Sequence, residues 1–215
     1  MHNRINSLLD LAGISRQAVS HRERFITSFG GFCGILAVCF VSVTLLDAQG
    51  AAMIIASMGA SAVLLFAVPH SALAQPWNVI AGHLVSAVIG VSCALLITDI
   101  LLAAAAGVGC AIAAMHYLRC IHPPGGATAL TAVIGGPAVY AMGYDYVLQP
   151  VFINALVILG VAIVFNALFD YYRYPARQIS TTKPAESHDE HYPPIAHADL
   201  VYALSQIDTL ITVSE

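Results

Sequence analysis

The sequence predicts an all-α fold, a polytopic bundle of membrane helices, from its composition and from the placement of its charges. Of the 215 residues, 59% are hydrophobic and only 9% are charged, whereas soluble domains carry about 25% charged residues. A charge at the bilayer centre costs roughly 2.5–3.5 kcal/mol, so fixed charges within the apolar stretch mark loops. Between Phe25 and Phe169 these charges are Asp47, Asp99, Arg119 and Asp145.

Charges and turn residues divide the apolar stretch into six segments, each close to the roughly 17–25 residues that a membrane helix needs. The segments run approximately over 26–46, 51–68, 77–98, 100–118, 124–140 and 150–169. Basic residues precede the first segment (Arg16, Arg22, Arg24) and follow the last (Arg173, Arg177, Lys183). The positive-inside rule therefore predicts that both termini are cytoplasmic, which requires an even number of crossings. The alternative is four crossings, with 51–68 and 124–140 re-entrant.

Outside residues 25–170, the predicted transmembrane domain, the chain is more polar. Residues 1–24 are predicted to form a cytoplasmic amphipathic segment, and 171–196, rich in proline and polar residues, a linker. Apolar side chains at helical spacing then predict a cytosolic amphipathic helix over 197–215. These side chains are Leu200, Leu204, Ile207 and Ile211.

Two short motifs repeat along the apolar stretch. Gly-Ala-Ser-Ala at 59–62 corresponds to Gly-Ala-Thr-Ala at 126–129, and each is followed by a Gln-Pro pair, at 75–76 and 149–150. Proline suits the first position of a helix, where its missing N–H costs nothing. Three segments per copy would invert the second copy relative to the first, a plan of transporters that bind substrate near the midplane. The copies cover about 26–98 and 100–169.

The stretch "CIHPPGGATAL" places a histidine, two prolines and two glycines in an apolar region. Prolines cannot continue a preceding helix but can open a new one. A helix start carries about half a positive charge and N–H groups without intrahelical partners, which attract anions. We therefore predict a small-anion site here, with a tight turn between crossings as the alternative. The predicted binding residues are His122, Pro123, Pro124, Gly125, Gly126 and Thr128.

The first repeat would add a second, opposed helix start if its helix breaks near Gly59. Gly59 and Ser61 are therefore included among the predicted anion-binding residues. For Ser61 and Thr128 the alternative role is helix packing, since small residues let membrane helices approach closely.

Histidines are the natural proton carriers of the apolar region because their pKa lies near 6.5. The predicted proton-coupling residues are His70, His83, His116 and His122. An inside-negative potential opposes anion entry by about 2.3 kcal/mol per 100 mV, which gives proton coupling a physical motive. For His83 the alternative is a helix–helix hydrogen bond, because Gly82, Ser86 and Gly90 form a small-residue face around it.

The stretches "IHPPGGATAL" and "GASAVLLFAVPHSALAQPWNVIAGHLVSAVIGV" resemble the HPP family of integral membrane proteins, over roughly residues 28–169. The resemblance implies a small multi-pass transporter, usually described with four spans. It also implies nitrite as the leading substrate, because relatives in plant plastids and cyanobacteria are associated with nitrite uptake.

The predicted function is transport of a small monovalent anion, with proton coupling as a hypothesis. An anion channel and a non-transporting scaffold or sensor acting through its C-terminal helix are the alternatives. No enzyme activity, cofactor or metal site is predicted, because no catalytic motif or metal-ligand spacing of cysteines is present. The expected partners are the lipid bilayer and a small inorganic anion, with no nucleic acid and with a homo-oligomer left open. The expected location is a bacterial inner (plasma) membrane.

Overall fold

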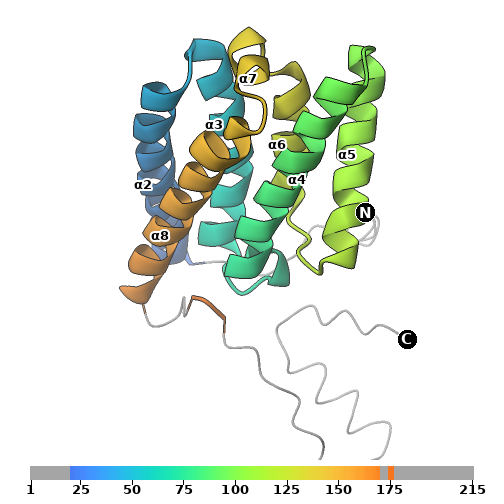
Figure 1. Cartoon of the computed structure of the whole chain (residues 1–215). Helices are drawn as coiled ribbons and strands as arrows, with labels where there is room; N and C mark the ends of the chain where they lie inside the picture. The colour runs from blue at the N-terminus through green and yellow to red at the C-terminus, as the bar shows by residue number, and fades with distance from the viewer. Residues whose placement is uncertain (1–19, 170–173, 177–215) are drawn as a thin grey trace, which may run out of the picture. The chain divides into compact units, whose positions relative to one another are not determined.

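The computed structural model describes residues 20–169 and 174–176, and within them every regular element is a helix (Figure 1). This confirms the predicted all-α fold for the described residues. The elements are α2 (His21–Leu45), α3 (Ala48–Ala67), the short η1 (Ala72–Ala74), α4 (Pro76–Leu96), α5 (Ile100–Tyr117), α6 (Pro123–Ile134), α7 (Pro137–Met142), the π-helical turn η2 (Val147–Phe152) and α8 (Ile153–Ala167).

Five helices of the described residues are long and apolar enough to cross a membrane: α2, α3, α4, α5 and the continuous Val147–Ala167 helix formed by η2 and α8. The segment predicted at 124–140 is instead two short helices, α6 and α7, separated by Gly135 and Gly136. With 12 residues α6 is about 18 Å long, whereas the hydrocarbon core is about 30 Å thick. Six full spanning helices are therefore not confirmed, and α6 is a half-helix.

The helices pack as an up-and-down bundle in which the start of α2 and the end of α8 lie at the same end, which also carries η1 (Figure 1). In this bundle α2 packs on α3 and α8, while α4 packs on α5 and α6. Helix α3 contacts both α6 and α8. These pairings are those expected if α5, α6 and α8 repeat α2, α3 and α4, and the inverted repeat itself stays a prediction.

The outer surface of the bundle is apolar, as a membrane environment requires. On α2 the side chains of Phe25, Phe32 and Phe40 are 72%, 62% and 75% exposed. The charged residues between α2 and α8 lie instead in caps and connections. Asp47 and Asp99 are the N-caps of α3 and α5, where their carboxylates accept backbone N–H groups. The sequence-based assignment of charges to loops therefore agrees with the structure.

Three predicted boundaries need correction. Helix α2 begins at His21, inside the predicted N-terminal segment 1–24, because the hydroxyl of Ser20 caps it by accepting the N–H of Glu23. Pro76 does open α4, but Pro150 lies inside the helical turn η2 and does not start a helix.

The third correction concerns the predicted linker 171–196. The hydroxyl of Tyr174 donates to Ala74 O at 2.6 Å, and the N–H of Ala176 donates to Gln75 Oε1 at 3.0 Å. The described part of this segment therefore packs on the connection between α3 and α4. The predictions for residues 1–19 and 177–215, including the C-terminal helix, lie outside the described residues.

Candidate functional site

The break between α5 and α6 places His122 inside the bundle. Helix α5 ends in a paired hydrogen-bond pattern in which Arg119 N–H donates to His116 O and Cys120 N–H donates to Met115 O. Arg119 has a φ of 52°, the left-handed conformation that this helix end requires. The backbone then extends to His122, the N-cap of α6. His122 therefore approaches the core on extended backbone instead of on a helix.

Two side chains at the start of α4 hydrogen-bond to the backbone of this extended segment. The indole of Trp77 donates to Leu118 O at 3.2 Å, and the amide of Asn78 donates to Ile121 O at 2.9 Å. Both carbonyls lie beyond the end of α5 and lack a helical partner, so these two side chains supply the bonds that the helix does not. Helix α4 therefore stabilises the break between α5 and α6, and these bonds hold His122 in place beside α4.

Five fully buried side chains form a continuous hydrogen-bonded array between α3, α4 and α6. Ser61 Oγ lies 2.9 Å from the Nε2 atoms of both His83 and His122. His83 Nδ1 lies 2.7 Å from Thr128 Oγ1, which in turn lies 2.7 Å from Ser57 Oγ. All five are 0% exposed. We call Ser57, Ser61, His83, His122 and Thr128 the histidine network.

Two backbone carbonyls close the ends of the histidine network. His122 Nδ1 lies 2.8 Å from Leu73 O in η1, and Ser57 Oγ lies 2.9 Å from Pro124 O. The planes of the two imidazole rings are inclined at 67°, with centroids 4.8 Å apart. Every ring nitrogen thus has a partner, which offsets the cost of burying these polar groups.

The structure brings together four of the residues that the sequence analysis selected: Ser61, His83, His122 and Thr128. The two residues that occupy the same position in the repeated motif, Ser61 and Thr128, bond to opposite nitrogens of His83. The analysis missed Ser57, although its position one turn before Ser61 on the same helix face was a usable signal.

The other predicted residues lie elsewhere. His70 and His116 are exposed, in the connection after α3 and in the last turn of α5. Helix α3 runs unbroken through Gly59, which lines a surface groove beside Gly31 of α2. The expected second helix start near Gly59 is therefore wrong, since nothing in α3 forces a break there.

The start of α6 offers fewer backbone donors than the sequence suggested. Pro123 and Pro124 have no N–H, and the N–H of Gly125 donates to His122 O at 2.8 Å. A Cβ added to Gly125 would lie 2.7 Å from Ser86 Oγ and 2.8 Å from Gly82 O. Gly125 therefore lets α6 pack directly on α4. Anion attraction at this helix start would depend on the helix dipole and on His122.

Comparison with known proteins identifies the family. The family model described as "HPP, transmembrane region" matches residues 16–175. This chain belongs to the HPP transmembrane family. A transmembrane protein of Dictyostelium discoideum is 37% identical over 148 residues, which are 67% of this chain and 47% of that protein. A second from the same organism is 39% identical over 154 residues, 69% of this chain and 53% of that protein.

This HPP chain spans about half the length of these two curated relatives. No solved structure matches it. The match covers the whole described bundle and the histidine network within it.

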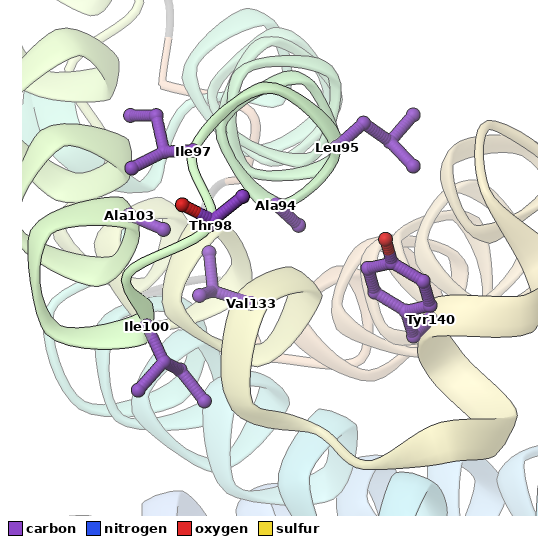
Figure 2. A pocket seen from close by; sticks show the side chains of 8 residues that line it. All are labelled: Ala94, Leu95, Ile97, Thr98, Ile100, Ala103, Val133 and Tyr140. Carbon is purple, nitrogen blue, oxygen red and sulfur yellow. The ribbon is translucent and has the colours of Figure 1, made fainter.

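A pocket of the HPP bundle lies at the opposite end of α4 from η1 (Figure 2). Apolar side chains dominate its wall, and Thr98 and Tyr140 contribute hydroxyls. None of the histidine network lines it, so it is a separate feature. Its lining residues are Ala94, Leu95, Ile97, Thr98, Ile100, Ala103, Val133 and Tyr140. Among the residues that the structure describes, no cluster of His, Cys, Asp or Glu suits a metal ion.

Proposed function

We propose that this HPP protein carries a small monovalent anion across the membrane together with a proton, with nitrite as the leading candidate. The histidine network is the observation that supports this proposal. Ionisable side chains inside a membrane bundle are costly and mark proton or ion pathways. Here two imidazoles, His83 and His122, are fully buried and joined by one hydroxyl, that of Ser61. Histidine is the side chain best suited to gain and lose a proton near neutral pH.

The position of His122 also supports coupling between the proton and an anion. As the N-cap of α6, His122 lies at the positive end of a helix. A proton on its ring would add one positive charge to the roughly half charge of the helix start, and a monovalent anion bound beside it would offset most of this charge. An anion alone would meet a largely apolar core. Proton and anion therefore stabilise one another at this position, and their joint movement avoids the opposing membrane potential.

Full burial of the network favours a carrier over an open pore. All five side chains are 0% exposed, so access from either side requires a change of conformation. Half-helices that point their positive ends at a midplane site are common in inverted-repeat transporters. We propose that α6 with its preceding extended segment completes a sixth crossing, so that the start of α2 and the end of α8 both lie on the cytoplasmic side. A bacterial plasma membrane is the proposed location.

The test is anion uptake into proteoliposomes that contain the purified protein. Nitrite, nitrate, formate and chloride are compared with and without an inward proton gradient, at zero clamped voltage. The variants are His83→Gln and His122→Gln, with His116→Gln as the control because His116 is exposed and outside the network. We expect saturable nitrite uptake that rises with the proton gradient. It should fall by about 100-fold in the two network variants, the lower end of what a positioned proton-transfer group contributes.

Three outcomes would contradict this proposal. Equal uptake with and without the proton gradient would remove proton coupling. An absence of flux for every anion, from protein shown to be folded, would remove transport and favour the scaffold. Currents too large for alternating access would identify a channel instead.

A further inference from the structure

The hydrogen bonds of the histidine network have one consistent direction when both histidines are neutral. Leu73 O can only accept, so His122 carries its hydrogen on Nδ1 and its Nε2 must accept. Ser61 therefore donates to His122 and accepts from His83 Nε2. This assigns the Nδ1–H tautomer to His122 and the Nε2–H tautomer to His83.

The same argument fixes the direction of the bonds among His83, Thr128 and Ser57. His83 Nδ1 must accept, so Thr128 donates to it. A hydroxyl has a single hydrogen, so the 2.7 Å contact between Thr128 and Ser57 is a bond that Ser57 donates. All three hydroxyls thus donate toward His122.

One added proton on His122 Nε2 reverses all four bonds between members of the network, while His122 Nδ1 still donates to Leu73 O. Ser61 then accepts from His122 and donates to His83 Nε2. His83 holds its hydrogen on Nδ1 and donates to Thr128, which donates to Ser57. The hydrogen of Ser57 turns to Pro124 O, 2.9 Å away. Both arrangements satisfy every donor, and no non-hydrogen atom has to move between them.

We propose that the histidine network is a proton relay in which the hydroxyl of Ser61 passes protons between the Nε2 atoms of His83 and His122. A proton that arrives at Ser57 Oγ displaces the hydrogen of Ser57 to Thr128, and that of Thr128 moves to His83 Nδ1. His83 releases its Nε2 hydrogen to Ser61, which releases its own to His122 Nε2. Each hydroxyl ends with one hydrogen, His83 changes tautomer, and one proton has reached His122. The purpose of this relay rests on the proposed transport function, but its bond pattern does not.

Few other titratable groups surround the relay. The hydroxyl of Tyr146, the residue before η2, donates to Thr128 O at 3.2 Å, and Cys120 is buried beside Gly82 of α4. Helices α3 and α6 contribute no Asp, Glu, Lys, Arg or His to it. The fixed charges between α2 and α8 are all exposed. No group other than the two imidazoles therefore competes for the proton within the network.

The test uses full-length protein in liposomes, labelled with ¹⁵N at histidine, because ¹⁵N resonances distinguish the two neutral tautomers from the imidazolium. We expect an Nδ1–H signal for His122 and an Nε2–H signal for His83 at high pH. As the pH falls, His122 should become cationic, and His83 should change to Nδ1–H at the same midpoint. Assignment uses His83→Gln and His122→Gln.

Substitution of Ser61 separates a relay from a simple packing contact. Ser61→Ala should abolish the tautomer change of His83 while His122 still titrates, and Ser61→Thr should restore it. Ser86→Ala is the matched control, because Ser86 is equally buried one turn from His83 but its hydroxyl hydrogen-bonds to Met115 Sδ, at 3.8 Å, and to no member of the network.

Three outcomes would overturn the relay: an Nε2–H tautomer at His122 at high pH, a His83 tautomer that ignores the charge on His122, or no protonation of either histidine wherever the protein stays folded. The uptake assay reports on transport separately. A tautomer switch without anion flux would remove the transport function and keep the relay. Proton-coupled flux without the tautomer switch would remove the relay and keep the transport function.

Discussion

Gly82 of α4 packs directly against His122: a Cβ added at position 82 would lie 2.5 Å from the Cβ of His122. It would also lie 3.0 Å from Cys120 O. The missing side chain lets the extended segment before α6 lie directly on α4. This contact sets the position from which His122 reaches Ser61.

Gly82→Ala should therefore displace His122 and destabilise the bundle by about 1–3 kcal/mol, the usual cost of overpacking. The measurement is the thermal unfolding midpoint in detergent, together with nitrite uptake. Gly109→Ala in α5 is the control, because a Cβ there meets no atom within 4 Å. An unchanged midpoint and unchanged uptake in Gly82→Ala would show that the segment tolerates a shift.

Two adjacent glycines at the start of α6 should differ sharply in their tolerance of substitution by alanine. A Cβ on Gly125 would lie 2.7 Å from Ser86 Oγ, whereas the nearest atom to a Cβ on Gly126 is Val108 Cγ1 at 3.9 Å. We expect Gly125→Ala to lose most uptake and stability and Gly126→Ala to resemble the parent protein. If both variants instead keep their stability and lose nitrite affinity, measured as the uptake KM, the glycines expose backbone to the anion.

Thr128→Val removes the donor to His83 Nδ1 without changing the shape of the side chain. It should cost about 1–3 kcal/mol of stability, because a buried acceptor is left unsatisfied, and it should abolish proton-driven uptake. Thr128→Ser keeps the hydroxyl and should retain both. Thr44→Val is the control, since the exposed Thr44 hydroxyl bonds only its own helix at Val41 O. Proton-driven uptake that survives Thr128→Val would exclude Thr128 from the proton pathway.

Asn154 should prove structural. Its amide donates to Pro150 O at 2.8 Å, and its oxygen accepts from Ser42 at 3.2 Å, so it joins α8 to α2 away from the histidine network. A double-mutant cycle of Ser42→Ala and Asn154→Ala should give a coupling energy of about 0.6 kcal/mol, typical of membrane helix hydrogen bonds. Uptake should persist in all three variants, and its loss in Asn154→Ala alone would assign this residue to the transport path.

Tyr174 should stabilise the connection that carries Leu73. Its hydroxyl donates to Ala74 O at 2.6 Å, and burial raises the pKa of Tyr174. A raised pKa means that folding favours the protonated phenol, so this stabilisation is complete below the ordinary value of about 10 and is lost as the pH rises through the folded-state pKa. Tyr174→Phe should cost about 1 kcal/mol below pH 10 and should flatten the alkaline branch of the stability curve. Identical pH profiles for the two proteins would contradict this.

The spanning helices were predictable because their signal is local. A membrane helix satisfies its own backbone within about 20 apolar residues, so hydropathy and the positions of Asp47 and Asp99 delimited most segments closely. The half-helix α6 was counted as part of one full segment, with a re-entrant segment as the alternative, although the prolines that open it were recognised. Composition alone does not distinguish 12 helical residues followed by α7 from one continuous crossing.

The site was predicted in part. Histidine chemistry and the repeated Gly-Ala-Ser/Thr-Ala motif selected His83, His122, Ser61 and Thr128. They could not select Ser57, show that His70 and His116 lie outside the histidine network, or show that Gly125 packs on α4. Each of these depends on which helix face meets which neighbour, and the hydropathy of a membrane helix is too uniform to reveal it.

The sequence by itself determined an all-helical membrane protein, the loop positions of its charges and a helix start at Pro123. These follow from the energetics of burying charge and backbone in lipid, which act residue by residue along the chain. Only the tertiary structure decided that two histidines from different helices share one serine, and that one carbonyl, Leu73 O, fixes the direction of their hydrogen bonds. Such an arrangement depends on distances of about 3 Å between residues far apart in sequence, and only the packing of α3, α4 and α6 supplies those distances.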